Sequence, residues 1–212
     1  MISEGSLSVP LDGWERSERP HAWENRHGDT LSIHHFALAP DLPCSLTSMT
    51  PIREHYRKLL GSAGGIVEAE PILVSELSCL RVIVKVRQTP NGIAYIASLT
   101  LPFRDCSLVV KVQCPELGMT GIRDTVVSEK LLSKGSSIRH ADPYAPRYRN
   151  ATLRSSADDA EWDALFPGHP LSRARSHLSA LEQLSASKEV RALPPFERSA
   201  PRSFFGRLFG GA

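Results

Sequence analysis

The sequence has almost no excess charge and no long apolar run. Its 25 Lys and Arg residues nearly balance its 23 Asp and Glu residues, which leaves a formal net charge of +2. A nucleic-acid-binding protein normally carries a basic domain or stripe, so we expect no nucleic-acid partner. No run approaches the roughly 18 apolar residues of a membrane helix, and residues 1–14 lack a cationic segment followed by an apolar one. These absences favour a cytoplasmic protein that is not stably inserted in a membrane.

Cysteine is scarce, and the recognisable catalytic motifs are missing. Cys44, Cys79, Cys106 and Cys114 form no C-x-x-C pair and lack histidines at zinc-site spacing. Free cysteine is among the residue types most often buried, so we expect buried free thiols. The sequence also lacks a G-x-S-x-G elbow, a P-loop, a G-x-G-x-x-G turn after a strand and an H-E-x-x-H pair. We therefore predict that the protein is not an enzyme and uses no metal or cofactor.

The histidines do not complete a metal site in the sequence. His34 and His35 are adjacent on an expected strand, so their rings point to opposite faces. His169 and His177 are eight residues apart and can share a helix face, but no carboxylate or cysteine at adjacent spacing completes a ligand set. The acidic cluster at residues 158–163 is placed to complement a helix N-terminus. We interpret all these side chains as surface, core or capping groups.

The strongest positive signal lies in residues 80–114, where apolar and polar residues alternate. A period of two is typical of half-buried strands. Asn91-Gly92 is the favoured pair for a two-residue hairpin loop, and this loop places Val82 opposite Leu101. Apolar residues then meet apolar residues along the whole hairpin.

The same register puts charged residues on the outer face of the sheet. Lys85 and Arg87 lie there beside Lys111 of the third run, if residues 102–107 form the second loop. Such a basic surface suits an acidic partner, because charge complementarity steers association. Lys85, Arg87 and Lys111 are therefore candidate partner-binding residues. The alternative is a sheet face that is solvated or partly covered by the third helix.

Shorter strands are expected on either side of this region. Residues 13–16, 22–25 and 30–36 have the composition of an antiparallel meander with turn residues between them. Residues 66–74 form a further strand, in which Pro71 indicates a sheet edge or a bulge.

Three helices complete the expected fold. Thr50 caps the first, with Pro51 at its first position, and Thr120 caps the second. Pro170 opens the third. Its inward residues share one helical face: Leu171, Ala174, Leu178 and Leu181.

The predicted fold class is α+β, a twisted antiparallel β-sheet flanked by helices with a C-terminal helical extension. We expect residues 1–133 to hold the sheet with two helices. Residues 134–186 form an irregular crossing and the C-terminal helix, packed on the same domain. Residues 187–212 are expected to be a flexible, basic, Phe-rich tail.

Trp14 opens the first strand of this arrangement, and the segment Gly-Met-Thr-Gly-Ile-Arg at 118–123 opens the last helix before residue 133. The order of elements over residues 13–133 resembles the PsbP/Mog1/DcrB-like fold. Proteins of that fold are generally non-enzymatic and bind other proteins, and small bacterial members include candidate immunity and secretion-accessory proteins. The resemblance implies a sandwich fold and a protein partner, such as a toxin or a secretion component. It transfers no functional residue.

The C-terminal tail is a second candidate for partner binding. Its basic and aromatic residues are Arg202, Phe204, Phe205, Arg207 and Phe209. Segments of this kind dock into grooves or lie on anionic membranes. Docking on a partner, peripheral membrane contact and packing on its own domain all stay open.

We therefore predict a non-enzymatic protein-binding module that uses the sheet face or the tail. The alternative is a small-ligand carrier or an unrecognised enzyme. Its pocket would lie between the sheet and the helices and would be lined by Tyr95, Cys114 and Tyr144.

Overall fold

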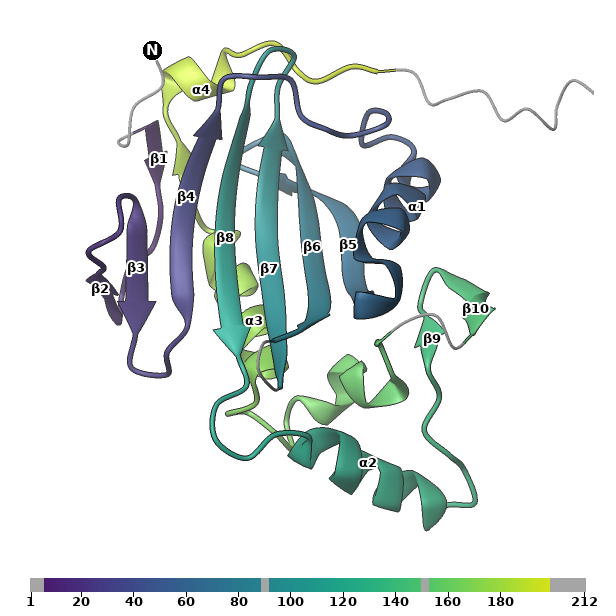
Figure 1. Ribbon diagram of the computed structural model, residues 1–212. Helices are drawn as coiled ribbons and strands as arrows, with labels where there is room; N and C mark the ends of the chain where they lie inside the picture. The colour runs from purple at the N-terminus through teal and green to yellow at the C-terminus, as the bar shows by residue number, and fades with distance from the viewer. Residues whose placement is uncertain (1–5, 89–91, 150–152, 199–212) are drawn as a thin grey trace, which may run out of the picture.

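The computed structural model describes residues 6–88, 92–149 and 153–198, and its centre is a seven-stranded antiparallel sheet (Figure 1). The strands β5 to β8 follow one another in the chain and are neighbours in the sheet, as consecutive strands usually are. In their order across the sheet, the strands are β2 (Trp14–Arg16), β3 (Ala22–Asn25), β4 (Thr30–Phe36), β8 (Ser107–Pro115), β7 (Ile93–Pro102), β6 (Leu77–Arg87) and β5 (Gly64–Val74). The predicted meander is confirmed, and β5 is an edge strand with a register shift between Ile66 and Glu68.

Helices flank this sheet on both sides, so the predicted α+β class is confirmed. α3 (Pro170–Leu181) packs on β7 and β8 behind the sheet in Figure 1, and α1 (Met49–Leu60) packs on β5 in front of it. α2 (Ile122–Leu132) lies beyond one end of the strands. The short elements are β1 (Leu7–Ser8), η2 (Gly61–Ala63), β9 (Ala141–Asp142), β10 (Ala145–Arg149), η3 (Ser156–Asp158), η4 (Ala160–Trp162), β11 (Ser185–Ala186) and α4 (Lys188–Arg191).

The pairing of β7 with β8 has the predicted register. Leu101 lies opposite Leu108, and Ala97 lies opposite Val112. These rows belong to the core under α3, to which the helix contributes the four inward residues that the sequence predicts. The helix also begins at Pro170 as predicted.

The pairing of β6 with β7 differs from the prediction. Val82 lies opposite Ser98 rather than Leu101, and the loop spans residues 88–92 instead of two residues. An odd shift moves every side chain of a strand to the other face. The valines of β6 therefore face α1, and Lys85 turns toward the α3 side of the sheet.

Both faces of β6 are covered, and this explains why the alternation alone gave the wrong register. Leu80, Val82 and Val84 pack with Ile52 of α1, while Ile83 packs in the core under α3. A strand buried on both faces has no solvent side for its polar residues. The charges of β6 must then find partners inside the protein.

Two predicted helix caps are displaced. The N-cap of α1 is Ser48 rather than Thr50. The N-cap of α2 is Gly121 rather than Thr120, and Gly121 has a φ of +76°, a conformation that favours glycine. The Gly121 N–H donates to the Glu116 carboxylate at 3.1 Å, which closes the loop that leads into α2.

The flexible tail was predicted to begin at residue 187, but the structure is ordered beyond that residue. Residues 187–198 include α4, whose Val190 is buried, and Phe196 is buried in the cluster beneath α1. Pro195 forms a bridge with Phe103 at the end of β7. Apolar contacts therefore hold the chain as far as residue 198. Among the described residues, no helix is long and apolar enough to cross a membrane.

Candidate functional site

Lys85 lies in the interior rather than on a docking face. Its Nζ is 3.1 Å from Asp158 Oδ2, and Tyr95 donates its hydroxyl to Asp158 Oδ1 at 2.9 Å. Burial and then the Asp158 charge raise the pKa of Tyr95, so its phenol stays protonated. The prediction that Lys85 contacts a partner is wrong, because its ammonium group is enclosed and already paired.

The other basic residues do not form the predicted row. Lys111 lies opposite Ser98 and is half-buried on the side of the sheet away from α3. Arg87 is exposed at the end of β6, on the same face of the strand as Lys85. The tail candidates lie outside the described residues: Arg202, Phe204, Phe205, Arg207 and Phe209.

A fully buried arginine fixes the segment between η3 and α3. Arg123 donates to the carbonyl oxygens of Ala157 and Asp159, and to the side chains of Asp163 and Ser172. Because four of its five N–H donors are directed at protein groups, this guanidinium acts as a structural clamp.

The three residues of the predicted small-ligand pocket do not meet around one cavity. Tyr95 and Cys114 lie opposite each other on β7 and β8, and both are fully buried in the core under α3. Tyr144 packs with the cluster beneath α1, where its hydroxyl accepts from the Ala69 N–H at 2.8 Å. The prediction of a pocket lined by these three residues is therefore wrong.

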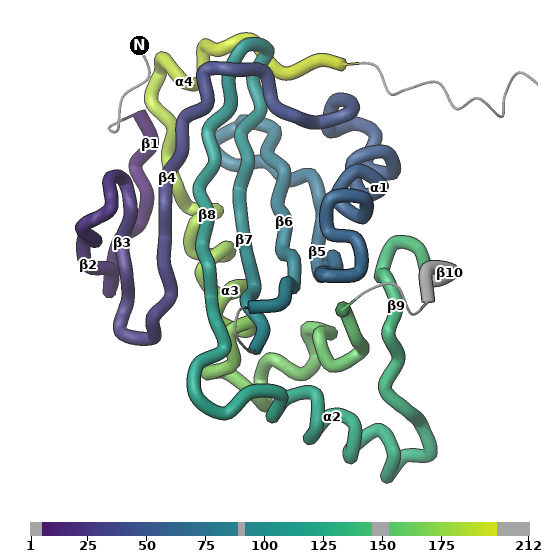
Figure 2. Tube along the Cα trace, viewed as in Figure 1, coloured from purple at the N-terminus to yellow at the C-terminus, as the bar shows by residue number. Residues whose placement is uncertain are grey.

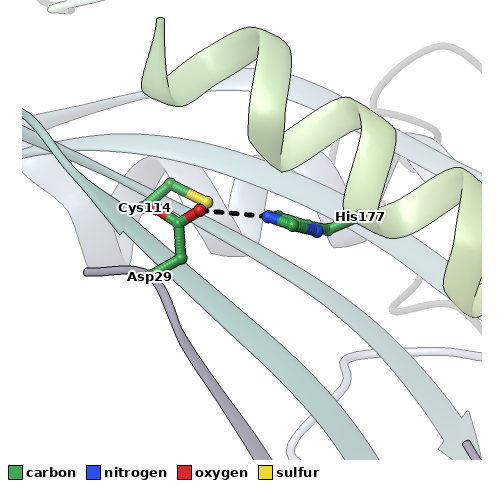
Figure 3. A group of neighbouring side chains, drawn as sticks. All are labelled: Asp29, Cys114 and His177. Atoms are coloured by element: carbon green, nitrogen blue, oxygen red, sulfur yellow. Dashed lines mark hydrogen bonds and ion pairs between the residues drawn. The ribbon is translucent and has the colours of Figure 1, made fainter. Parts of the chain in front are cut away.

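A compact polar cluster joins the β3–β4 turn, the end of β8 and α3 (Figure 3). Asp29, Cys114 and His177 place their potential ligand atoms within 4.8 Å of one another. The His177 Nε2 lies 3.0 Å from Asp29 Oδ2. Burial and the nearby Asp29 carboxylate raise the pKa of the Cys114 thiol.

These three residue types are ligands that zinc accepts, but the carboxylate is already engaged. Arg173 donates from Nη2 to Asp29 Oδ1 at 2.7 Å and from Nε to Asp29 Oδ2 at 2.9 Å. Burial opposes the Asp29 charge, but the hydrogen bonds from His177, Arg173 and Asn25 outweigh it and hold the pKa of Asp29 well below its usual value. A second cation would be repelled by the adjacent guanidinium. We therefore interpret the cluster as an ion-pair lock.

A different arrangement surrounds the loop from β8 to α2, which turns at one end of the sheet (Figure 2). A pocket of about 360 Å³ lies between this loop and the start of α3. Its apolar lining includes Leu117, Met119, Ile122 and Phe166. The volume lies within the range of about 300–1,000 Å³ typical of ligand pockets.

Two nearly buried polar side chains also line this pocket. His169 and Glu116 have side chains that are only 9% and 8% exposed, and His169 Nε2 is 3.7 Å from Glu116 Oε1. That separation is too long for a hydrogen bond, and His169 Nε2 is buried without a hydrogen-bond partner. A buried donor in this state costs free energy unless another group pairs with it.

The imidazole of His169 is held rigidly from two sides. Its Nδ1 accepts the Leu171 N–H at 3.2 Å, which caps α3, and the Tyr95 ring meets it edge-on with 5.5 Å between centroids. Because Nδ1 accepts, the proton of the neutral ring is on Nε2. Burial opposes the Glu116 charge, but contacts with His169 and Gly121 outweigh it and lower the pKa of Glu116.

The rim of the pocket is apolar and exposed. The exposed fractions are 61% for Leu117, 80% for Met119 and 46% for Ile122. Single exposed apolar residues are normal, but these three fall within six consecutive residues at one pocket. We call Leu117, Met119 and Ile122 the apolar rim. A contiguous patch of this kind indicates an interaction surface.

A larger hollow of about 1290 Å³ lies near the turn between β5 and β6 and the C-terminal segment. Its described lining residues include no buried side-chain atom that lacks a hydrogen bond. It therefore offers volume without an unsatisfied polar group, and the smaller pocket is the better candidate site.

Sequence reasoning missed Glu116, His169 and the apolar rim as a site. Residues 118–123 contributed only a predicted helix cap, Thr120, and the fold resemblance, and His169 was weighed only with His177. The available signal was two large apolar residues, Leu117 and Met119, in a Gly-containing loop where polar residues are usual, followed by Ile122 at the start of α2. The pairing of Glu116 with His169 spans 53 positions, so no local pattern contains it.

Comparison with known proteins identifies no family. No family model matches the sequence, and no curated protein is similar to it. Among the solved structures that match is one titled a protein of unknown function, PA94, from Pseudomonas aeruginosa, putative regulator, with 9% sequence identity and a TM-score of 0.33. The match covers 61% of this chain and 78% of that one. This likeness is too weak to support an argument about function.

Proposed function

We propose that the protein is a non-enzymatic protein-binding module whose partner docks on the apolar rim. The observation that carries the proposal is the exposure of Leu117, Met119 and Ile122 around a pocket with a rigid floor. Binding energy at interfaces concentrates in a few residues that fill such pockets. The partner would insert a side chain between the rim residues and bury them.

Three buried ion pairs of the described chain favour a structural role for their charges over a catalytic one. Lys85 is paired with Asp158, Arg123 with Asp163, and Asp29 with Arg173. A catalytic acid or base needs a free position beside a reacting group. Lys85 and Asp158 tie the sheet to η3, Asp29 and Arg173 tie the β3–β4 turn to α3, and Arg123 and Asp163 tie α2 to the segment before α3.

The fold resemblance extends the proposal to an immunity or secretion-accessory role, in which the partner is a toxin or a secretion component. A small-ligand carrier is the second candidate, because the pocket volume suits a small molecule. A ligand at 100 times its dissociation constant adds about 2.7 kcal/mol of stability. A thermal-shift screen against small molecules therefore tests the second candidate separately.

The test is purification of the tagged full chain from its native host. We expect a stoichiometric partner with the wild type and loss of most of it with the double variant Leu117→Asp/Met119→Asp. Leu38→Asp is the matched control, since Leu38 is 75% exposed and lies outside the pocket lining. Retention of the partner by the double variant, or absence of a stoichiometric partner with the wild type, would overturn the proposal.

A truncation ending at Arg198 separates the apolar rim from the Phe-rich tail. If the rim is sufficient for docking, the truncated protein retains the partner at the wild-type ratio. Loss of the partner on truncation, with the double variant unaffected, would move the docking site to the tail.

A further inference from the structure

We infer that the partner anchors itself in this pocket with a tyrosine side chain, whose hydroxyl bridges His169 and Glu116. The inference rests on the proposed function and specifies what the partner inserts. It follows from the one buried donor that lines the pocket without a hydrogen bond, His169 Nε2.

The two polar groups of the pocket require one atom that both accepts and donates. His169 Nε2 carries a proton, because Nδ1 accepts from the Leu171 N–H. Glu116 Oε1 lies 3.7 Å away and accepts. An oxygen placed about 2.8 Å from each atom would accept from His169 and donate to Glu116. A hydroxyl group satisfies both conditions.

Other partner groups fail at one of the two contacts. A carboxylate would accept from His169 but would be repelled by Glu116. An ammonium group would donate to Glu116 but could not accept from His169. A serine or threonine would bring the hydroxyl without the apolar body that the rim and Phe166 can bury.

A phenol matches the whole pocket. Its ring would lie among the rim residues and Phe166, whose own ring is held by Arg123, with 5.8 Å between the guanidinium carbon and the ring centroid. Tyrosine combines an apolar body with a polar tip and is enriched among the residues that dominate interfaces. His169 Nε2 is itself buried, so the hydroxyl must pass between rim side chains. Met119 is exposed and unbranched, which suits it to move aside.

The probes are N-acetyl-L-tyrosinamide and N-acetyl-L-phenylalaninamide, which differ only in the hydroxyl. Binding to the full chain is followed by the NMR shifts of the Met119 and Ile122 methyl groups. Because hydrogen bonds to a charged group are worth more than neutral ones, we expect the tyrosine probe to bind about tenfold more tightly or better. Equal affinities would overturn the inference and indicate that a water molecule alone bridges His169 and Glu116.

His169→Asn is the matched variant, since asparagine still caps a helix but lacks the Nε2–H donor. We expect it to bind both probes equally, within about twofold, through the apolar walls alone. A tenfold preference retained by this variant would overturn the inference. Should the variant fail to fold, Glu116→Gln serves instead. It keeps an oxygen acceptor for Gly121 without the charge, and we expect it to lose several-fold of the preference.

The two proposals fail in different ways. If neither probe shifts the methyl groups at its solubility limit, the tyrosine inference is overturned. Loss of the partner from Leu117→Asp/Met119→Asp would still support the docking surface in that case. If the tyrosine probe binds with the expected preference but the double variant keeps its partner, the inference that the pocket binds a phenol is supported and the proposed function fails.

Discussion

The two faces of β6 are both covered, yet they are built from opposite chemistry. Toward α1 the strand presents Leu80, Val82 and Val84, which pack as an ordinary apolar layer. Toward α3 it presents Arg81 and Lys85 on either side of Ile83. The α3 side of β6 tolerates buried charges because carboxylates from other elements of the chain pair with them there.

Those carboxylates come from three separate elements. Asp158 of η3 pairs with Lys85, while Glu68 of β5 and Glu182 after α3 both pair with Arg81. The pairs with Asp158 and Glu182 join the sheet to η3 and to the segment after α3, and the pair with Glu68 joins β5 to β6. The charged face of β6 thus helps to position the segments around α3. The proposed docking surface, by contrast, lies on the loop between β8 and α2, at the end of the sheet.

The largest expected effect separates two lysines that the sequence placed side by side. Lys85→Met should lower the free energy of unfolding by about 3–5 kcal/mol, because it leaves Asp158 buried without its counter-charge. Lys111→Met, on the half-exposed face, should change it by no more than about 0.5 kcal/mol. Chemical denaturation measures both, and similar losses for the two variants would refute the difference between the faces.

The ion-pair lock at Asp29 should give the next largest effect. Asp29→Asn should cost about 2–3 kcal/mol at neutral pH, since hydrogen bonds to a charged group are lost. The folded-state pKa of Asp29 is lowered, so its stabilisation is present above the unfolded pKa and declines as the pH falls below about 4.

The wild type should therefore lose more stability than Asp29→Asn when the pH is lowered through this range. A series of denaturation curves at decreasing pH measures this difference. Parallel losses in the two proteins would show that Asp29 is not a source of the acid sensitivity.

A small effect on stability is expected at the apolar rim. Leu117→Asp/Met119→Asp should change the free energy of unfolding by no more than about 1 kcal/mol, because each of the two exposed sites should contribute about 0.5 kcal/mol or less. The same variant should lose the partner. Denaturation of the purified variant provides the check, and a loss above 2 kcal/mol would mean that the rim is part of the core.

Strands were predictable where one face of the sheet is apolar. The pairing of Leu101 with Leu108 follows from alternation alone, and so do the inward residues of α3. The register of β6 was not predictable in this way. Its two faces are both buried, and the groups that neutralise Lys85 lie 39 and 73 residues farther along the chain, at Asp124 and Asp158.

The candidate site was less predictable than the fold. A pocket depends on the packing of a loop against the start of a helix, and its two polar residues, Glu116 and His169, are brought together only by the tertiary structure. The sequence shows that Leu117 and Met119, which are exposed in the structure, are large apolar residues in an expected loop, and this is unusual. Their exposure, however, becomes known only once the neighbouring surfaces are in place.

Side-chain footprinting of the isolated complex tests the central claim most directly. Radical oxidation of Met119 and acetylation of Lys111 are measured by mass spectrometry in the free and the bound protein. We expect the partner to protect Met119 strongly and to leave Lys111 unchanged. Protection of Lys111 with full oxidation of Met119 would contradict the account and return the docking surface to the open face of the sheet.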